Sequence, residues 1–89
     1  MNIKQVMRNY TGGRDGANFD GRILSQPWQS HYYLFREQGY LYDEEVYVFW
    51  LMDKEEVDSV NELDMLNWDD PDWIENEDGE VIAGECPWK

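Results

Sequence analysis

The sequence predicts one α+β domain over residues 1–89, a small antiparallel β-sheet with one or two helices packed on one face. Three observations predict this fold class. Residues 46–52 (VYVFWLM) form an apolar run that is typical of a strand covered on both faces, and such a strand lies centrally in a sheet. The segment that follows Asp53 carries apolar residues at helical spacing. Asp78-Gly79 lies between two apolar-containing runs, which predicts a β-hairpin.

The N-terminal third predicts shorter elements. Residues 1–10 place apolar side chains at helical spacing, so one short amphipathic helix is expected there. Residues 11–20 contain three glycines and predict a loop, and no Gly-Lys-Ser/Thr follows that would indicate a phosphate-binding loop. Residues 22–25 are expected to form a short strand that Pro27 ends.

Strand-forming aromatic residues dominate the next stretch. Residues 30–37 (SHYYLFRE) predict a strand, and Gly39 is expected to interrupt it. Residues 40–42 fit either a second short strand or part of a turn, and the sequence leaves both open. The apolar run at residues 46–52 follows; its length, aromatics and valines favour a strand over a buried helix.

A helix is predicted to begin at Lys54. Asp53 and Glu56 have the spacing of a capping box, with Asp53 as the N-cap. The helix would carry apolar residues on one side and acids on the other, namely Glu55, Asp58 and Glu62. Beyond Leu63 the apolar pattern drifts, so either this helix bends or a second short one begins.

The C-terminal part predicts the hairpin. Asp69-Asp70-Pro71 is expected to end one secondary-structure element or to begin another, because the residue before a proline disfavours helix. Residues 72–76 and 80–83 are the expected strands, joined across Glu77-Asp78-Gly79. Trp88 is expected to pack on the core.

Charge is the most unusual property of the chain. The net charge is −13, and residues 53–80 alone hold 13 acids and one base. A domain with this charge repels itself, so a function or solubility must offset that cost. Residues 1–36 are instead mildly basic, but the field of the acidic remainder opposes direct binding of nucleic acid there.

The sequence offers little for catalysis or metal binding. One cysteine and one histidine exclude an intramolecular disulfide and a cysteine-based metal cluster. If Gly79 is aligned with the glycine at the sixth position of an EF-hand calcium loop, Ile74 falls at the first ligand position, where a side-chain oxygen is needed. We therefore expect no enzyme activity, no metal and no cofactor. No apolar stretch approaches the length of a membrane span, so a cytoplasmic location is expected.

The acids suggest a polyanionic surface instead. Duplex DNA shows about one charge per 1.7 Å of axis, and Glu55, Asp58 and Glu62 on one helix would span roughly 10 Å. An acidic face of that spacing would be steered to a basic nucleic-acid-binding groove and would block it. The predicted partner-binding residues are Glu55, Asp58, Glu62, Asp64, Asp69, Asp70, Asp72, Glu75, Glu77 and Asp78.

In size, charge and aromatic content the chain resembles the small acidic inhibitors encoded by phages and mobile elements: DNA mimics, anti-restriction proteins and anti-CRISPR proteins. The resemblance is to a class, covers no motif and transfers no residue role. It implies an inhibitor that acts in the host cytoplasm on a basic nucleic-acid-binding protein, with no direct contact to nucleic acid or membrane. The alternative is an interaction module without mimicry, such as an antitoxin, immunity protein or adaptor, that binds through exposed aromatics. A homodimer that extends the acidic face stays open.

Overall fold

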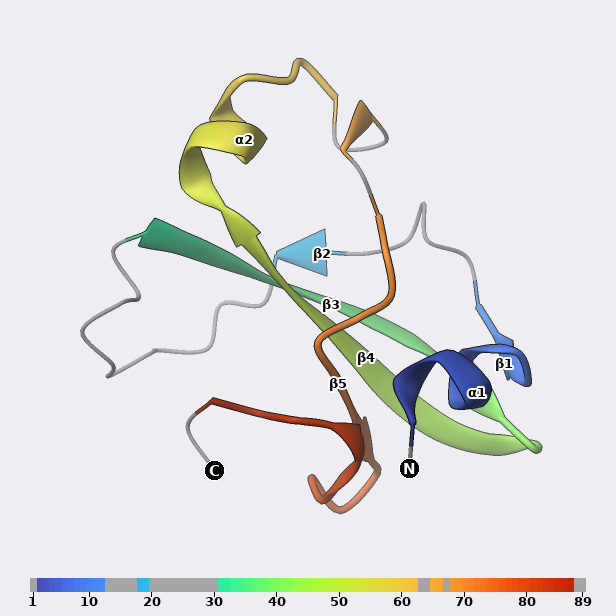
Figure 1. Cartoon of the computed structure of the whole chain (residues 1–89). Helices are drawn as coiled ribbons and strands as arrows, with labels where there is room; N and C mark the ends of the chain where they lie inside the picture. Colours follow the sequence, from blue (N-terminus) through green and yellow to red (C-terminus); the bar gives the residue numbers. More distant parts are fainter. Residues whose placement is uncertain (1, 13–17, 20–30, 63–64, 67, 88–89) are drawn as a thin grey trace.

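Antiparallel β-structure dominates the fold (Figure 1). The computed structural model describes residues 2–12, 18–19, 31–62, 65–66 and 68–87. Within these residues a curled antiparallel sheet is accompanied by two short helices, which is an α+β fold that is mostly sheet. No helix in the described ranges is long and apolar enough to cross a membrane.

The strand order of the sheet is β1-β3-β4-β5-β6, with β2 also paired to β3. The central strand β4 pairs with β3 on one side and with β5 on the other, and its ladder with β3 runs from Tyr32↔Asp53 to Leu41↔Glu44. The elements in chain order are α1 (Ile3–Met7), β1 (Tyr10–Thr11), β2 (Asn18–Phe19), β3 (Tyr32–Leu41), β4 (Glu44–Asp53), α2 (Lys54–Asp58), β5 (Trp73–Asn76) and β6 (Val81–Gly84).

Strand β4 is covered on both faces, as its apolar run predicts. On one face its side chains join the main core, which also contains Val6 of α1, Phe35 of β3 and Ile74 of β5. On the other face Phe49 stacks on Trp73, with ring centroids 4.9 Å apart. The central position predicted for this strand is therefore confirmed.

Strand β3 is longer than predicted, because it does not stop at Gly39. It continues to Leu41, so Tyr40 belongs to the strand and Tyr42 to the turn. The ring of Tyr10 lies directly against Gly39 and occupies the space that a side chain would need there. Strand β1 brings Tyr10 to this position by pairing it with Leu41. The glycine thus accommodates a ring from 29 residues earlier in the chain rather than ending the strand.

Both helices are shorter than predicted. Asp53 caps α2 as expected, and its Oδ1 accepts hydrogen bonds from the backbone N–H of Glu55 (2.8 Å) and Glu56 (3.4 Å). The helix ends at Asp58, however, and residues 59–62 are not helical, so the predicted continuation of the helix past Asp58 is wrong. No residue of α2 is fully buried, and Ser59 donates from its hydroxyl to the Glu56 carbonyl at 2.7 Å. Packing therefore adds little that would prolong a helix of like charges.

The hairpin between β5 and β6 is confirmed. The Gly79 N–H donates to the Asn76 carbonyl (3.0 Å), and the Asn76 N–H donates to the Glu80 carbonyl (2.9 Å). The Asn76 side chain accepts from the backbone of Asp78 and Glu80, and Gly79 adopts φ +82°. This is a turn followed by a left-handed glycine, as the Asp-Gly pair indicates.

Two expectations concern segments outside the described residues: the strand at residues 22–25 and the packing of Trp88. Strand β2 falls within residues 11–20, which were expected to be a loop. It pairs with β3 for two residues, Asn18↔Arg36 and Phe19↔Phe35.

Candidate functional site

Most of the exposed or half-buried acids in the described part of the chain form two groups, one toward each end of β4. Figure 1 shows this long strand crossing the molecule. The first group lies where β4 meets α2 and where the chain returns toward β5. We call it the helix-end acids: Asp53, Glu55, Glu56, Asp58, Asp69, Asp70 and Asp72. All seven residues are exposed, although the carboxyl group of Asp72 is partly buried.

Aromatic packing holds the segment that carries Asp69 and Asp70. The half-buried ring of Trp68 makes edge-to-face contacts with Phe35 (centroids 5.4 Å apart) and Trp50 (5.2 Å). The Trp50 indole N–H donates to the backbone carbonyl of Asp69 at 2.8 Å. The two carboxylates therefore project from backbone that the core fixes in place.

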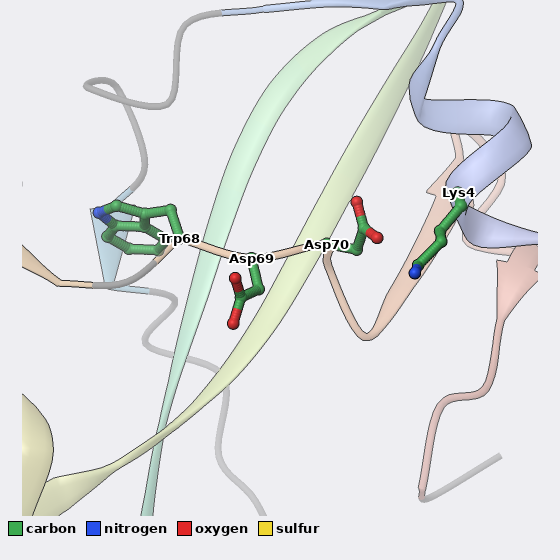
Figure 2. A pocket seen from close by; sticks show the side chains of 4 residues that line it. All are labelled: Lys4, Trp68, Asp69 and Asp70. Atoms are coloured by element: carbon green, nitrogen blue, oxygen red, sulfur yellow. The ribbon is translucent and has the colours of Figure 1, made fainter.

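Two cavities meet at Asp69 and Asp70. One has a volume of about 480 Å³ and is lined by Lys4, Trp68 and the two aspartates. Figure 2 shows the Lys4 side chain extending from α1 toward the segment that carries them. The other cavity, of about 310 Å³, adds Glu56 and Asp72 to the same two aspartates above β4. Acids thus line both hollows, and Lys4 lines only the first.

Asp72 also has a structural task. Its Oδ2 accepts from the Leu51 N–H at 2.7 Å, and its own N–H donates to the Phe49 carbonyl at 2.8 Å. Asp72 therefore extends the hydrogen bonding between β4 and β5 by one residue, to the position just before β5 begins. Partial burial raises the pKa of Asp72, and the hydrogen bond from Leu51 opposes that shift as the smaller effect.

The structure corrects the predicted acidic face at Glu75. This residue is only 5% exposed, and its Oε2 accepts from the Trp73 indole N–H at 2.8 Å. Residues two apart in a strand share a face, so Glu75 lies on the side of the buried Trp73. Its carboxylate is not part of the exposed acidic surface.

The remaining predicted acids are distributed along the chain. Glu55 and Asp58 lie in α2, and Asp58 Oδ1 accepts from the Tyr33 hydroxyl at 3.2 Å, which raises the pKa of Tyr33. Glu62 is exposed but follows the end of α2, so it does not continue a helical row. Asp64 lies outside the described residues.

The second group surrounds the two hairpin turns, and includes Glu77 and Asp78 of the predicted set. The β4–β5 register pairs Val46 with Asn76 and so places the two turns together. A cavity of about 270 Å³ lies between them, lined by Glu44, Glu45 and residues 76–78. We call this group the turn-end acids: Asp43, Glu44, Glu45, Glu77, Asp78 and Glu80.

Sequence reasoning missed several members of both groups, and the only local signal for them was their position beside a turn or a cap. The missed acids are Asp43, Glu44, Glu45, Asp53, Glu56 and Glu80. The nearest members of the two groups, Asp72 and Glu77, flank β5 and are five residue steps apart, or about 17 Å. The two ends of β4, at Glu44 and Asp53, are nine residue steps apart, or roughly 30 Å. This length approaches the longest dimension of the molecule, 35 Å.

Tyrosines accompany the turn-end acids. Tyr40 is 51% exposed and Tyr42 is 70% exposed. Beside them, Glu45 Oε1 accepts from the Gln38 amide (2.6 Å) and from the Tyr47 hydroxyl (2.7 Å). The second of these hydrogen bonds is the main cause that raises the pKa of Tyr47.

No protein-family model, curated protein or solved structure was found to match this chain. Among the described residues, no group of three or more histidines, cysteines, aspartates or glutamates is placed to hold a metal ion. A function must therefore be inferred from the geometry of the two acidic groups.

Proposed function

We propose that this protein is a DNA-mimic inhibitor that blocks the nucleic-acid site of a host defence protein, of the CRISPR or restriction kind, or of another DNA-binding protein. One observation carries the proposal: exposed carboxylates lie at both ends of one continuous strand, β4, and these ends are roughly 30 Å apart. One turn of B-DNA advances about 34 Å. A protein surface that contacts phosphates one turn apart would find carboxylates at a similar separation.

The scaffold supports this proposal because it fixes the charges in advance. The helix-end acids are tied to the core through the cap at Asp53 and the contacts of Trp68. The turn-end acids are tied through the hydrogen bonds of Asn76. Carboxylates positioned before binding lose less conformational freedom on association than carboxylates on a flexible tail.

A displacement experiment tests mimicry. The immobilised protein is exposed to a bacterial lysate at physiological salt, and retained proteins are then eluted with a duplex of ~12 bp, which is about 40 Å long. Mimicry predicts that the duplex releases basic DNA-binding proteins and that stepped salt releases the same ones. Retained proteins that salt elutes but the DNA duplex does not elute would contradict the proposal.

Neutralising exposed acids tests the helix end directly. The variant Glu55→Gln/Glu56→Gln/Asp69→Asn/Asp70→Asn removes four charges without touching the side-chain hydrogen bonds of Asp53 or Asp72. It should bind the released proteins more weakly and with a flatter salt dependence. The control Glu55→Asp/Glu56→Asp/Asp69→Glu/Asp70→Glu changes the same four side chains but keeps their charges, and it should bind nearly as the parent does.

A second candidate is an interaction module without mimicry, such as an antitoxin, immunity protein or adaptor. The exposure of Tyr40, Tyr42 and Met65 favours it, because such side chains often dominate interfaces. In that case alanine at these positions would weaken binding more than loss of the acids. Duplex DNA would also fail to displace the partner.

A further inference from the structure

The turn between β3 and β4 has a conformation that its sequence does not favour. Leu41 pairs with Glu44, which leaves a two-residue turn. Both of its residues have positive φ, 51° at Tyr42 and 66° at Asp43. Two-residue turns of this kind strongly prefer Asn-Gly, because a side chain with a bulky Cβ substituent is strained there. A tyrosine at the first position is therefore costly.

Packing does not account for the tyrosine. Tyr42 is 70% exposed, so burial returns little of the cost of its backbone conformation. Its strand neighbour Tyr40 is 51% exposed as well. Strained backbone that carries an exposed aromatic side chain is typical of a binding position rather than of a position selected for stability.

The surroundings of these tyrosines are acidic. Tyr40 pairs with Glu45 across the ladder, and Glu44 follows the turn. Both glutamates line the cavity of about 270 Å³ that the second hairpin closes with Glu77 and Asp78. The hairpin end therefore presents two exposed aromatic rings, at Tyr40 and Tyr42, beside the glutamates that line this cavity.

The same sheet already contains the arrangement that such a site would make with a partner. The guanidinium of Arg36 lies over the Tyr47 ring, 5.4 Å from its centroid, and the Tyr47 hydroxyl donates to Glu45. An arginine stacked on a tyrosine beside a glutamate is a stable combination on this face. Guanidinium groups suit it because they stack on aromatic rings and bind carboxylates with two parallel hydrogen bonds.

We propose that residues 40–45, which we call the tyrosine hairpin, anchor the protein to arginine side chains of its basic partner. The inference rests on the proposed function and assigns a specific task to its turn end. An arginine stacks on Tyr40 or Tyr42 and its guanidinium pairs with Glu44 or Glu45. The helix-end acids supply attraction for either kind of basic side chain, while the tyrosine hairpin prefers arginine over lysine.

Two peptides of equal length, oligo-arginine and oligo-lysine, serve as probes in calorimetric titrations at physiological ionic strength. The protein should bind oligo-arginine several-fold more tightly. In Tyr40→Thr/Tyr42→Asn this preference should fall by roughly two- to five-fold per tyrosine, with little change for oligo-lysine. Threonine suits the strand and asparagine suits positive φ, so the variant should melt at the parent temperature or a few degrees higher.

The matched control is Tyr32→Thr, an exposed tyrosine at the opposite end of β3. It should leave the arginine preference intact. Equal binding of the two peptides by the parent protein, or an equal effect of Tyr32→Thr, would overturn the tyrosine hairpin as the anchor while leaving the acidic mimic standing. Failure to bind either peptide would count against the mimic as well.

Discussion

Replacing Gly84 by alanine should destabilise the fold far more than the same change at Gly79. Both glycines have positive φ, +74° and +82°. A Cβ at Gly84 would collide with the Asp72 carbonyl oxygen and lie 2.8 Å from the Trp73 Cα. At Gly79 the nearest atom is Glu75 Oε1 at 4.0 Å. Comparing the two alanine variants therefore separates the free-energy cost of a left-handed backbone, which both share, from the cost of steric overlap, which only Gly84→Ala has.

The magnitudes follow from these contacts. Left-handed backbone costs a non-glycine residue about 1–2 kcal/mol, and this applies at both positions. Overlap with backbone atoms that cannot rotate away adds about 1–3 kcal/mol at Gly84 alone. The expected loss is therefore about 2–5 kcal/mol there, against a total stability of roughly 4–13 kcal/mol for a chain of this length. To relieve the overlap, β6 would have to move away from β5. This movement would break the 3.2 Å hydrogen bond that the Glu85 N–H donates to the Asp72 carbonyl.

Urea unfolding followed by tryptophan fluorescence measures both variants in one assay, since Trp50 and Trp73 are buried in the sheet. The midpoint of Gly84→Ala should fall well below that of Gly79→Ala at an unchanged slope. A variant Gly79→Asn should lose less than Gly79→Ala, because asparagine tolerates positive φ. Equal midpoints for the two alanine variants would refute the packing argument at the β5–β6 junction.

Three further changes have defined outcomes. Asp53→Ala should cost about 0.5–2 kcal/mol of unfolding free energy through loss of the α2 cap, while Asp53→Asn should cost little, as chemical denaturation would show. Burial raises the pKa of Asp72 above its ordinary 3.8, so the folded state holds that proton more tightly than the unfolded state. Its ionisation therefore lowers stability as pH rises from 3.8 through the raised pKa, and Asp72→Asn should remove this part of the pH dependence of the urea midpoint. The melting temperature should rise between low and physiological salt, because salt screens the repulsion of a chain with net charge −13; a flat salt profile in differential scanning fluorimetry would contradict it.

Local signals predicted the elements that depend on local chemistry. The apolar run of β4, the cap at Asp53 and the turn at Asp78-Gly79 each lie within a few residues of the contacts that define them. The burial of Glu75 was also within reach. It lies two residues from Trp73 in a strand, and the indole N–H that it binds belongs to that residue.

The remaining differences depend on distant parts of the chain. Gly39 stays in β3 because the ring of Tyr10 covers it, and nothing near Gly39 in the sequence indicates that contact. The turn at Tyr42 and Asp43 lacks the Asn-Gly signature and is imposed by the long ladder on both sides. The grouping of the turn-end acids depends on the register between β4 and β5, which the sequence does not state.

The length of the β3–β4 ladder, rather than a helical repeat, sets the distance between the two acidic groups. Glu37 and Glu75 within the sheet are buried, and most of the exposed acids among the described residues lie near the two ends of the ladder. At physiological salt charges are screened over about 8 Å, which is less than the roughly 17 Å between the nearest members, Asp72 and Glu77, and much less than the roughly 30 Å between the ends of β4. Each group must therefore act on its own part of the partner. A protein that recognises both needs two basic patches about one turn of DNA apart, whereas a partner with a single patch would engage one end and be indifferent to the other.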